Sequence, residues 1–182
     1  GYTDFIPCIW YQRTLNVPEA WAGQQILLNF GAVDYESTIY IDGKEVMKHY
    51  GTGSSFTADI TQFVTPGKPA NLVVYVLDDL RGGKQPGGKQ STNLNSAGCH
   101  YTRTTGIWQT VWLEAVEPAY VTSYKVFANI SAPAVTLDVL TSNAAVGAEL
   151  TVKAYYEGAF MGEASATVAS SVDECSPALF AD

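Results

Sequence analysis

Two pairs of neighbouring carboxylates have the residue types and spacing that could support acid–base chemistry. Asp78 and Asp79 are adjacent, and Asp34 is two residues from Glu36. Consecutive side chains of a strand point to opposite faces, so Asp78 and Asp79 are badly placed to act on one substrate. Asp34 and Glu36 could share a face, but Asp34 follows a segment that is typical of a bend at a strand end. We expect these acids to be solvated or to cap turns.

Residue patterns for covalent or metal chemistry are weak. The histidines are His49 and His100, and no Gly-x-Ser-x-Gly elbow accompanies them. Cys8, Cys99 and Cys175 lie far apart without a Cys-x-x-Cys pair, and the histidines are too few for a zinc cage. The sequence therefore predicts no metal, no cofactor and no disulfide framework. A single pair, Cys8–Cys99 for instance, stays open.

Composition narrows the classes of partner. Hydrophobic residues make up 47% of the 182 residues, and the net charge is −8 without a basic cluster. A protein that binds nucleic-acid phosphates needs the opposite charge balance. The sequence has no apolar run of the roughly 20 residues that a membrane-spanning helix needs. We therefore expect neither a nucleic acid nor a membrane as partner.

The elements that must position the polar residues are predicted to be strands, because apolar and polar residues alternate. Pro18 ends the first run, and residues 19–23 resemble one helical turn. Asp42 and Gly43 are typical of a tight hairpin turn. Short strands with such turn signals favour an all-β sandwich or jelly roll. The strands predicted before Pro118 cover residues 9–16, 26–30, 37–41, 45–49, 55–60, 72–77 and 107–113.

The texture of the sequence changes after Pro118, where aromatic residues become rare and alanine, valine, threonine and serine dominate. The pattern predicts two domains, residues 1–118 and 119–182. The second is expected to be a small β-sandwich of immunoglobulin type, which needs about seven strands and ~100 residues. Residues 119–182 are too few, so we expect this domain to be incomplete. Its predicted strands cover residues 120–129, 135–140, 149–156 and 160–169.

The tryptophans are expected to divide between core and surface. Even spacing on a strand puts Trp108 and Trp112 on one face, and apolar neighbours on the other face predict a central strand. Trp10, Trp108 and Trp112 are therefore predicted to lie in the core. Trp21 follows Pro18 in a polar turn and is predicted to be the most exposed of the four.

Several blocks, taken in order, resemble the N-terminal region of glycoside hydrolase family 2, which holds β-galactosidases, β-glucuronidases and β-mannosidases. The most specific block is residues 105–113, with Thr105, Gly106 and Trp108. Each block alone is ordinary strand-and-turn chemistry, but their order is hard to obtain by chance. The blocks are residues 9–18, 28–35, 40–46, Phe56, 59–61, 71–72 and 105–113.

The resemblance implies a jelly-roll, galactose-binding-like sandwich followed by an immunoglobulin-like sandwich. In complete enzymes a TIM barrel comes third and carries two glutamates, an acid and a nucleophile about 5–5.5 Å apart, for retaining hydrolysis of β-linked glycosides. The chain would then be a non-catalytic part that packs on its own barrel, shapes the pocket wall and is inactive alone. Bacterial relatives favour a periplasmic or secreted location.

The polar loop of residues 81–103 carries the candidate binding residues. In the family this loop reaches over the barrel mouth, and residues 86–90 resemble a pattern of bacterial members, with Gly88 where arginine is common. The resemblance then implies that five side chains of this chain lie near substrate in the full enzyme. They are Lys89, Gln90, His100, Tyr101 and Arg103.

Plainer roles stand beside this assignment. Lys89 and Gln90 could be solvated, His100 could be an ordinary loop histidine, and Arg103 could anchor the loop by binding carbonyl groups. Two other classes of function remain. An independent carbohydrate-binding module would show an exposed aromatic patch or a calcium cluster, and the sequence indicates neither. A purely structural sandwich would bind no sugar, and it does not account for the ordered blocks.

Overall fold

The computed structural model of the protein describes residues 4–131 and 134–169. The chain divides into two compact units, with the boundary between Ala115 and Val116, and each unit is described by itself. The described structure is almost entirely β, because its helical segments are single turns of 3-10 helix. No described segment forms a helix that is long and apolar enough to span a membrane.

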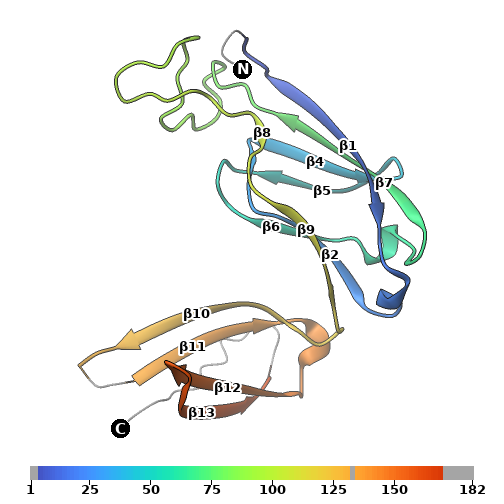
Figure 1. Cartoon of the computed structure of the whole chain (residues 1–182), viewed down its shortest axis with the longest axis vertical. Helices are drawn as coiled ribbons and strands as arrows, with labels where there is room; N and C mark the ends of the chain where they lie inside the picture. Colours follow the sequence, from blue (N-terminus) through green and yellow to red (C-terminus); the bar gives the residue numbers. More distant parts are fainter. Residues whose placement is uncertain (1–3, 132–133, 170–182) are drawn as a thin grey trace. The chain divides into compact units, whose positions relative to one another are not determined.

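The first unit contains a four-stranded antiparallel sheet in the order β1-β7-β4-β5 (Figure 1). The predicted Asp-Gly hairpin joins β4 to β5, with Asp42 and Gly43 both at positive φ, 47° and 78°. This prediction is confirmed. The strands of the sheet are β1 (Cys8–Asn16), β7 (Pro69–Leu77), β4 (Glu36–Ile41) and β5 (Lys44–Tyr50).

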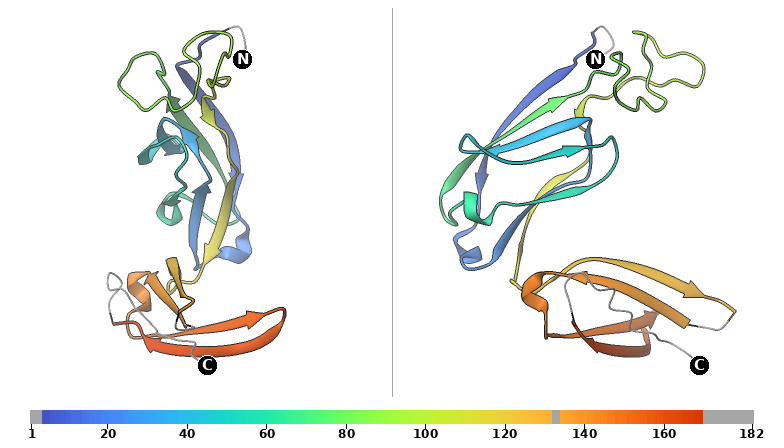
Figure 2. Two further views of the ribbon diagram at one scale, coloured as in Figure 1. Left: turned by 90° about the vertical axis from the view of Figure 1, so that its left-hand side faces the viewer. Right: turned by 180° about the vertical axis from the view of Figure 1, so that it is seen from behind.

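A second, three-stranded sheet in the order β6-β2-β9 faces the first (Figure 2). A short pair, β3 with β8, continues the pairing of β2 with β9, because Gly31 N donates to Thr110 O (2.8 Å) where the two pairs meet. The strands are β6 (Phe56–Asp59), β2 (Gln25–Phe30), β9 (Val111–Val116), β3 (Val33–Asp34) and β8 (Gly106–Ile107).

Gly106 is the one glycine of the Thr-Gly-Ile-Trp block, and the structure requires it. Its φ is 88°, and a Cβ added there would overlap the hydroxyl of Tyr11. The same hydroxyl accepts a hydrogen bond from Ile107 N (3.2 Å). Only glycine combines this backbone conformation with so close an approach. The block therefore joins the two sheets at one end of the sandwich.

The core of the first unit lies between the two sheets. Phe30 is fully buried and stacks on Phe56, with 4.7 Å between the ring centroids. Alternation along each strand places every second side chain inward, which is why the two sheets share one apolar layer. The largest fully buried side chains are Phe30, Ile26, Leu28, Ile39, Ile41, Ile60, Val33, Val74 and Val76.

The predicted core positions of three tryptophans are wrong. Trp10 is 64% exposed, Trp108 48% and Trp112 41%, whereas Trp21 is partly buried and packs against the core. The predicted central strand is interrupted after Ile107, and β9 is the last strand of its sheet. In this chain, the segment with apolar residues on both faces is therefore an edge strand, and one of its faces is exposed to solvent.

Among its described residues, the second unit contains two antiparallel hairpins with a 3-10 turn, η3 (Asn143–Ala145), between them. All four strands predicted after Pro118 are confirmed. Every residue of β10 is exposed. The hairpins are β10 (Val121–Asn129) with β11 (Ala134–Thr141), and β12 (Glu149–Tyr156) with β13 (Ala159–Thr167). That this domain is incomplete stays a prediction.

Phe30→Ala is expected to lower the free energy of unfolding of the first unit by about 3–5 kcal/mol, because it leaves a cavity between the sheets. Trp10→Ala is the matched control, since it removes a larger ring from an exposed position. It should cost about 1 kcal/mol or less. Urea unfolding followed by circular dichroism measures both. Equal losses in the two variants would contradict the core described above.

Candidate functional site

A long loop between β7 and β8 carries the five candidate residues, and it holds its shape mainly through side-chain hydrogen bonds. It extends beyond the strands at one end of the first unit (Figure 1). Its backbone forms isolated bridges between Gln90 and Tyr101 and between Ala97 and His100, and a few turn hydrogen bonds such as Gly82 N to Asp79 O (3.0 Å). The groups that hold the loop are therefore the starting point for the site.

Arg103 binds within the loop and to the N-terminal segment. Its Nη1 donates to Asn93 O (2.9 Å) and Leu94 O (3.2 Å), and its Nη2 donates to Asp4 O (3.1 Å). The guanidinium group also lies over the ring of Phe5, 4.2 Å from the centroid. Arg103 therefore orders the loop in this structure.

Arg81 covers the same ring. Its guanidinium carbon is 3.8 Å from the Phe5 centroid. A cation over an aromatic face is attracted by the ring quadrupole. Phe5 is thus held between the two ends of the loop, by Arg81 from its start and Arg103 from its end.

Gln90 connects the loop to the sheet. Its Nε2 donates to Asp34 Oδ2 of β3 (2.7 Å), and its Oε1 accepts from Thr104 N (2.6 Å). Both ends of the amide are therefore occupied. Gln90 therefore positions the loop against β3.

Asp78, just after β7, is a second internal anchor. It is buried, and its two oxygens accept from Gln85 Nε2 (2.5 Å) and Thr105 Oγ1 (2.9 Å). Its neighbour Asp79 is exposed. The two carboxylates therefore differ in burial, as expected for adjacent residues. The expectation that Asp78 is solvated or caps a turn is wrong, because Asp78 anchors the loop.

A cavity of about 320 Å³ lies beside the loop. Asp34 is buried at this cavity, with 3% of its surface exposed, and Oδ1 has no hydrogen-bond partner among the described residues. Trp108 is half exposed and donates from Nε1 to Thr52 O (2.8 Å). The lining residues are Asp34, Thr52, Gly53, Pro86, Gly87, Gly88, Lys89, Gln90, Thr104 and Trp108.

Lys89 is exposed at this cavity. Within the described part of the chain, its ammonium group has neither a hydrogen bond nor an ion pair. The half-exposed indole of Trp108 and the exposed ammonium group of Lys89 thus lie at one hollow, beside the buried carboxylate of Asp34. Such a combination suits a small polar ligand with hydroxyl groups and one apolar face.

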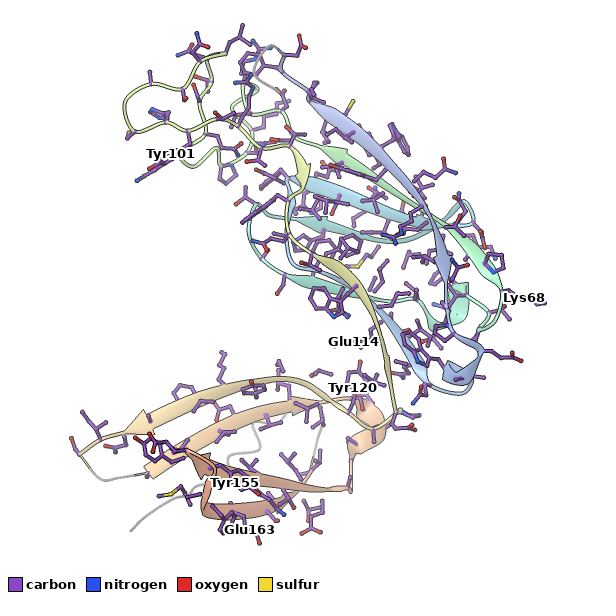
Figure 3. All side chains as sticks on the ribbon, in the orientation of Figure 1. Lys68, Tyr101, Glu114, Tyr120, Tyr155 and Glu163 are labelled. Atoms are coloured by element: carbon purple, nitrogen blue, oxygen red, sulfur yellow. The ribbon has the colours of Figure 1, made fainter. Side chains whose placement is uncertain are left out.

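His100 and Tyr101 lie apart from this cavity. Tyr101 is 66% exposed, and Figure 3 shows its side chain at the loop, away from the strands. His100 is exposed, and its Nδ1 lies 3.9 Å from Cys99 Sγ. The structure therefore brings two of the five candidates, Lys89 and Gln90, to one cavity.

The sequence places neither Trp108 nor Asp34 at this cavity. Trp108 is expected in the core, and Asp34 is considered only as an acid paired with Glu36. Glu36 instead accepts a hydrogen bond from Tyr50 Oη (3.3 Å). The signal that could have identified Asp34 is a carboxylate inside an apolar strand, since such a group needs a specific partner.

Neither of the two described cysteines forms a disulfide bond. Cys8 and Cys99 are free and exposed. Cys175 lies outside the described residues. Within residues 4–131 and 134–169, no cluster of three or more histidine, cysteine, aspartate or glutamate side chains could hold a metal ion.

Burial and, to a smaller extent, repulsion by Asp78 raise the pKa of Asp34 from 3.8 to about 6, although the hydrogen bond from Gln90 opposes the rise. The folded state therefore keeps this proton to a higher pH than the unfolded state, whose carboxyl titrates near 3.8. The free energy of unfolding must then fall as the pH rises from about 4 to about 6.

Asp34→Asn should remove this fall, which amounts to about 3 kcal/mol. The asparagine oxygen can still accept the bond from Gln90. Urea unfolding between pH 4 and pH 8 measures the difference. Asp79→Asn, at the exposed neighbour of Asp78, is the control and should retain the slope of the unchanged chain. A parallel pH profile for Asp34→Asn and the unchanged chain would count against the raised pKa.

A family model described as "Glycosyl hydrolases family 2, sugar binding domain" matches residues 3–116. A β-glucuronidase of Paenibacillus borealis is 32% identical over 89 residues, which are 49% of this chain and 15% of the relative. A β-galactosidase of Thermoanaerobacter pseudethanolicus is 24% identical over 114 residues, which are 62% of this chain and 14% of the relative.

Solved structures share the fold over nearly the whole chain. The apo β-glucuronidase of Ruminococcus gnavus has a TM-score of 0.73 and 21% identity, and the match covers 98% of this chain and 30% of that one. A family 2 member from Bacteroides cellulosilyticus has a TM-score of 0.68 and 17% identity. The chain therefore spans a small part of its relatives.

The all-β prediction, with a jelly-roll sandwich followed by an immunoglobulin-like one, is confirmed by these folds. The resemblance inferred from the ordered blocks is also confirmed, because the family model covers the first unit and more than half of the chain. The chain belongs to the glycosyl hydrolases of family 2, through their sugar-binding domain.

Proposed function

We propose that this chain is the non-catalytic N-terminal part of a retaining glycosidase that acts on β-linked glycosides, with β-glucuronides as the leading substrate class. The observation that carries the proposal is the match of the family model to residues 3–116. Support for the substrate comes from the printed names of the relatives, such as the β-glucuronidases of Paenibacillus borealis and Streptococcus agalactiae. A β-galactoside is the second choice, after the relative from Thermoanaerobacter.

The acid and the nucleophile are assigned to a barrel domain of the same polypeptide, outside these residues. Retaining hydrolysis needs two carboxyl groups about 5–5.5 Å apart, one protonated and one ionised and free to attack. The buried carboxylates described here do other work, since Asp78 accepts two hydrogen bonds and Asp34 holds Gln90. In this proposal the chain shapes a wall of the pocket and performs no bond cleavage.

Lys89 and Trp108 are the residues that would meet the sugar. An exposed indole face can pack on the apolar face of a pyranose. The ammonium group of Lys89 can bind a hydroxyl group or a uronate carboxylate, and the second contact is charge-assisted. Gln90, which already binds Asp34 and Thr104, would hold Lys89 in place. The proposed roles of His100, Tyr101 and Arg103 near substrate have no comparable support at the cavity.

Lys89→Met in the full-length enzyme should lower kcat/KM for a chromogenic β-glucuronide by about 10–100-fold, because a charge-assisted hydrogen bond contributes about 1.5–3 kcal/mol. A β-galactoside, which has no carboxylate, should be affected less. Lys68→Met is the matched control, since Lys68 is exposed at the other end of the same unit (Figure 3). Unchanged kinetics for Lys89→Met would remove Lys89 from the site.

An independent carbohydrate-binding module is the second candidate, and one observation favours it. Trp10 lies on the outer face of the four-stranded sheet, 4.5 Å from the ring of Tyr75 and 6.4 Å from that of Tyr40. The exposed aromatic patch that the sequence did not indicate is therefore present. Patches of this kind serve sugar binding in some domains and protein contacts in others.

Calorimetry of the 182-residue chain with glucuronic acid, galactose and mannose separates the two candidates. We expect no heat of binding at millimolar sugar and no turnover of a chromogenic glycoside, because the proposed pocket is completed by the barrel. Millimolar binding that Trp10→Ala abolishes would favour the module. Turnover by the purified chain would overturn the leading proposal.

A further inference from the structure

Trp108 lies outside the strands, in the gap between β8 and β9. Its backbone N donates to Ala32 O at 3.4 Å, which is long for such a bond. Its indole Nε1 donates to Thr52 O at 2.8 Å. Thr52 belongs to the β5–β6 connection, residues 51–55. The ring of Trp108 is therefore held in place by this connection.

The β5–β6 connection folds back on itself and touches the indole. It contains Gly51 and Gly53, and glycine leaves the backbone more conformational freedom than any other residue. A Cβ added at Gly51 would overlap Ser54 Oγ. One added at Gly53 would lie 3.9 Å from Cζ2 of Trp108. Gly51 N donates to Tyr35 O (3.1 Å), which ties down the start of the connection, so its other end needs a separate anchor.

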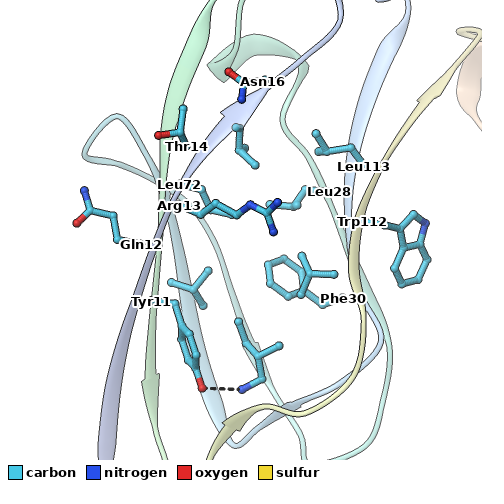
Figure 4. A pocket seen from close by; sticks show the side chains of 14 residues that line it. Tyr11, Gln12, Arg13, Thr14, Asn16, Leu28, Phe30, Leu72, Trp112 and Leu113 are labelled. Carbon is cyan, nitrogen blue, oxygen red and sulfur yellow. Dashed lines mark hydrogen bonds between the residues drawn. The ribbon is translucent and has the colours of Figure 1, made fainter.

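Three stacked rings lead from the core to this other end. Phe30 is fully buried and lies with Leu28 at a cavity of about 530 Å³ between the two sheets (Figure 4). Phe56 stacks on Phe30, and the ring of His49 stacks on Phe56, with 3.9 Å between the centroids and 17° between the planes. His49 Nε2 then forms a hydrogen bond with Ser54 Oγ (3.2 Å). The last ring of the column thus carries the nitrogen that holds the connection.

The state of His49 suits this role. The residue is partly buried, and burial lowers its pKa. The neutral imidazole therefore predominates at neutral pH, and its Nε2 either donates to the hydroxyl group of Ser54 or accepts from it. A flat ring stacked on Phe56 has little freedom to move, so the nitrogen offers Ser54 a fixed partner.

We propose that His49 is a positioning residue for the sugar site: through Ser54 it fixes the β5–β6 connection, on which the indole of Trp108 rests. The inference rests on the proposed function, in which Trp108 meets the sugar. Thr52, Gly53 and Trp108 line the cavity, and His49 is not among the described residues that line it. Because the indole would contact the sugar equally before and during the reaction, loss of the anchor should raise KM and leave kcat unchanged.

Nuclear magnetic resonance of the 182-residue chain tests the link between His49 and Trp108. The indole N–H signal of Trp108 is assigned by its loss in Trp108→Phe. Ser54→Ala should shift this signal and speed its exchange with water by about 3–10-fold, the range expected for one lost hydrogen bond. His49→Phe, which keeps the stacked ring, should do the same. The indole signals that should stay in place are those of Trp10, Trp21 and Trp112.

Matched variants separate the anchor from general damage. Ser54→Thr keeps the hydroxyl group, and Ser55→Ala removes a hydroxyl group from the exposed next residue, so neither should move the Trp108 signal. His49→Phe combined with Ser54→Ala should add no further shift, because both changes remove the same bond. An unchanged Trp108 signal in the two single variants would overturn the proposal. Equal shifts of all the indole signals would also overturn it, since they would show a general change of fold.

Kinetics of the full-length enzyme distinguish this proposal from the proposed function. Ser54→Ala should raise KM for a chromogenic β-glucuronide by about 3–10-fold and leave kcat within about two-fold. Trp108→Ala should raise KM at least as much. If Trp108→Ala leaves KM unchanged, the assignment of Trp108 to the sugar fails, and the positioning role falls with it. If Trp108→Ala raises KM and Ser54→Ala does not, only the role of His49 is overturned.

Discussion

The burial of β2 against the inner face of β7 and β4 is the constraint on which the first unit depends. Ile26, Leu28 and Phe30 of β2 are at most 1% exposed. Ile39 and Val74, which belong to the same core, come from the opposite sheet. Each such side chain contributes about 1.5–3 kcal/mol. Because β2 continues into β3, this packing also fixes the place of Asp34. The site therefore rests on the core through a single continuous run of chain.

The strands of the fold could be predicted from the local pattern of residues, but which strands lie side by side in a sheet could not. Alternation and turn chemistry indicated nearly every strand, and Asp42–Gly43 identified a hairpin with its turn conformation. The order of strands in a sheet is a long-range property. The pattern around Trp108 and Trp112 therefore suggested a central strand, while β9 lies at an edge. Apolar side chains on an edge strand and in a buried strand look alike in sequence.

The site was predicted in outline only. The loop was identified because its glycines and polar residues cannot form a core, and Lys89 and Gln90 do lie at its cavity. What the sequence could not supply is the partner of each group. The bond between Gln90 and Asp34 joins residues 56 positions apart, and the contacts of Arg103 are to backbone carbonyls. Such contacts leave no periodic signal along a chain.

The contacts of two guanidinium groups with the ring of Phe5 couple the loop to the N-terminal segment. Arg81 and Arg103 stand at opposite ends of the loop, and both rest on a ring that precedes β1. Tension or displacement of the polypeptide ahead of Phe5 is thereby transmitted to both stems of the loop at once. A fusion partner or purification tag placed close to Phe5 would therefore disturb the loop that carries Lys89 and Gln90.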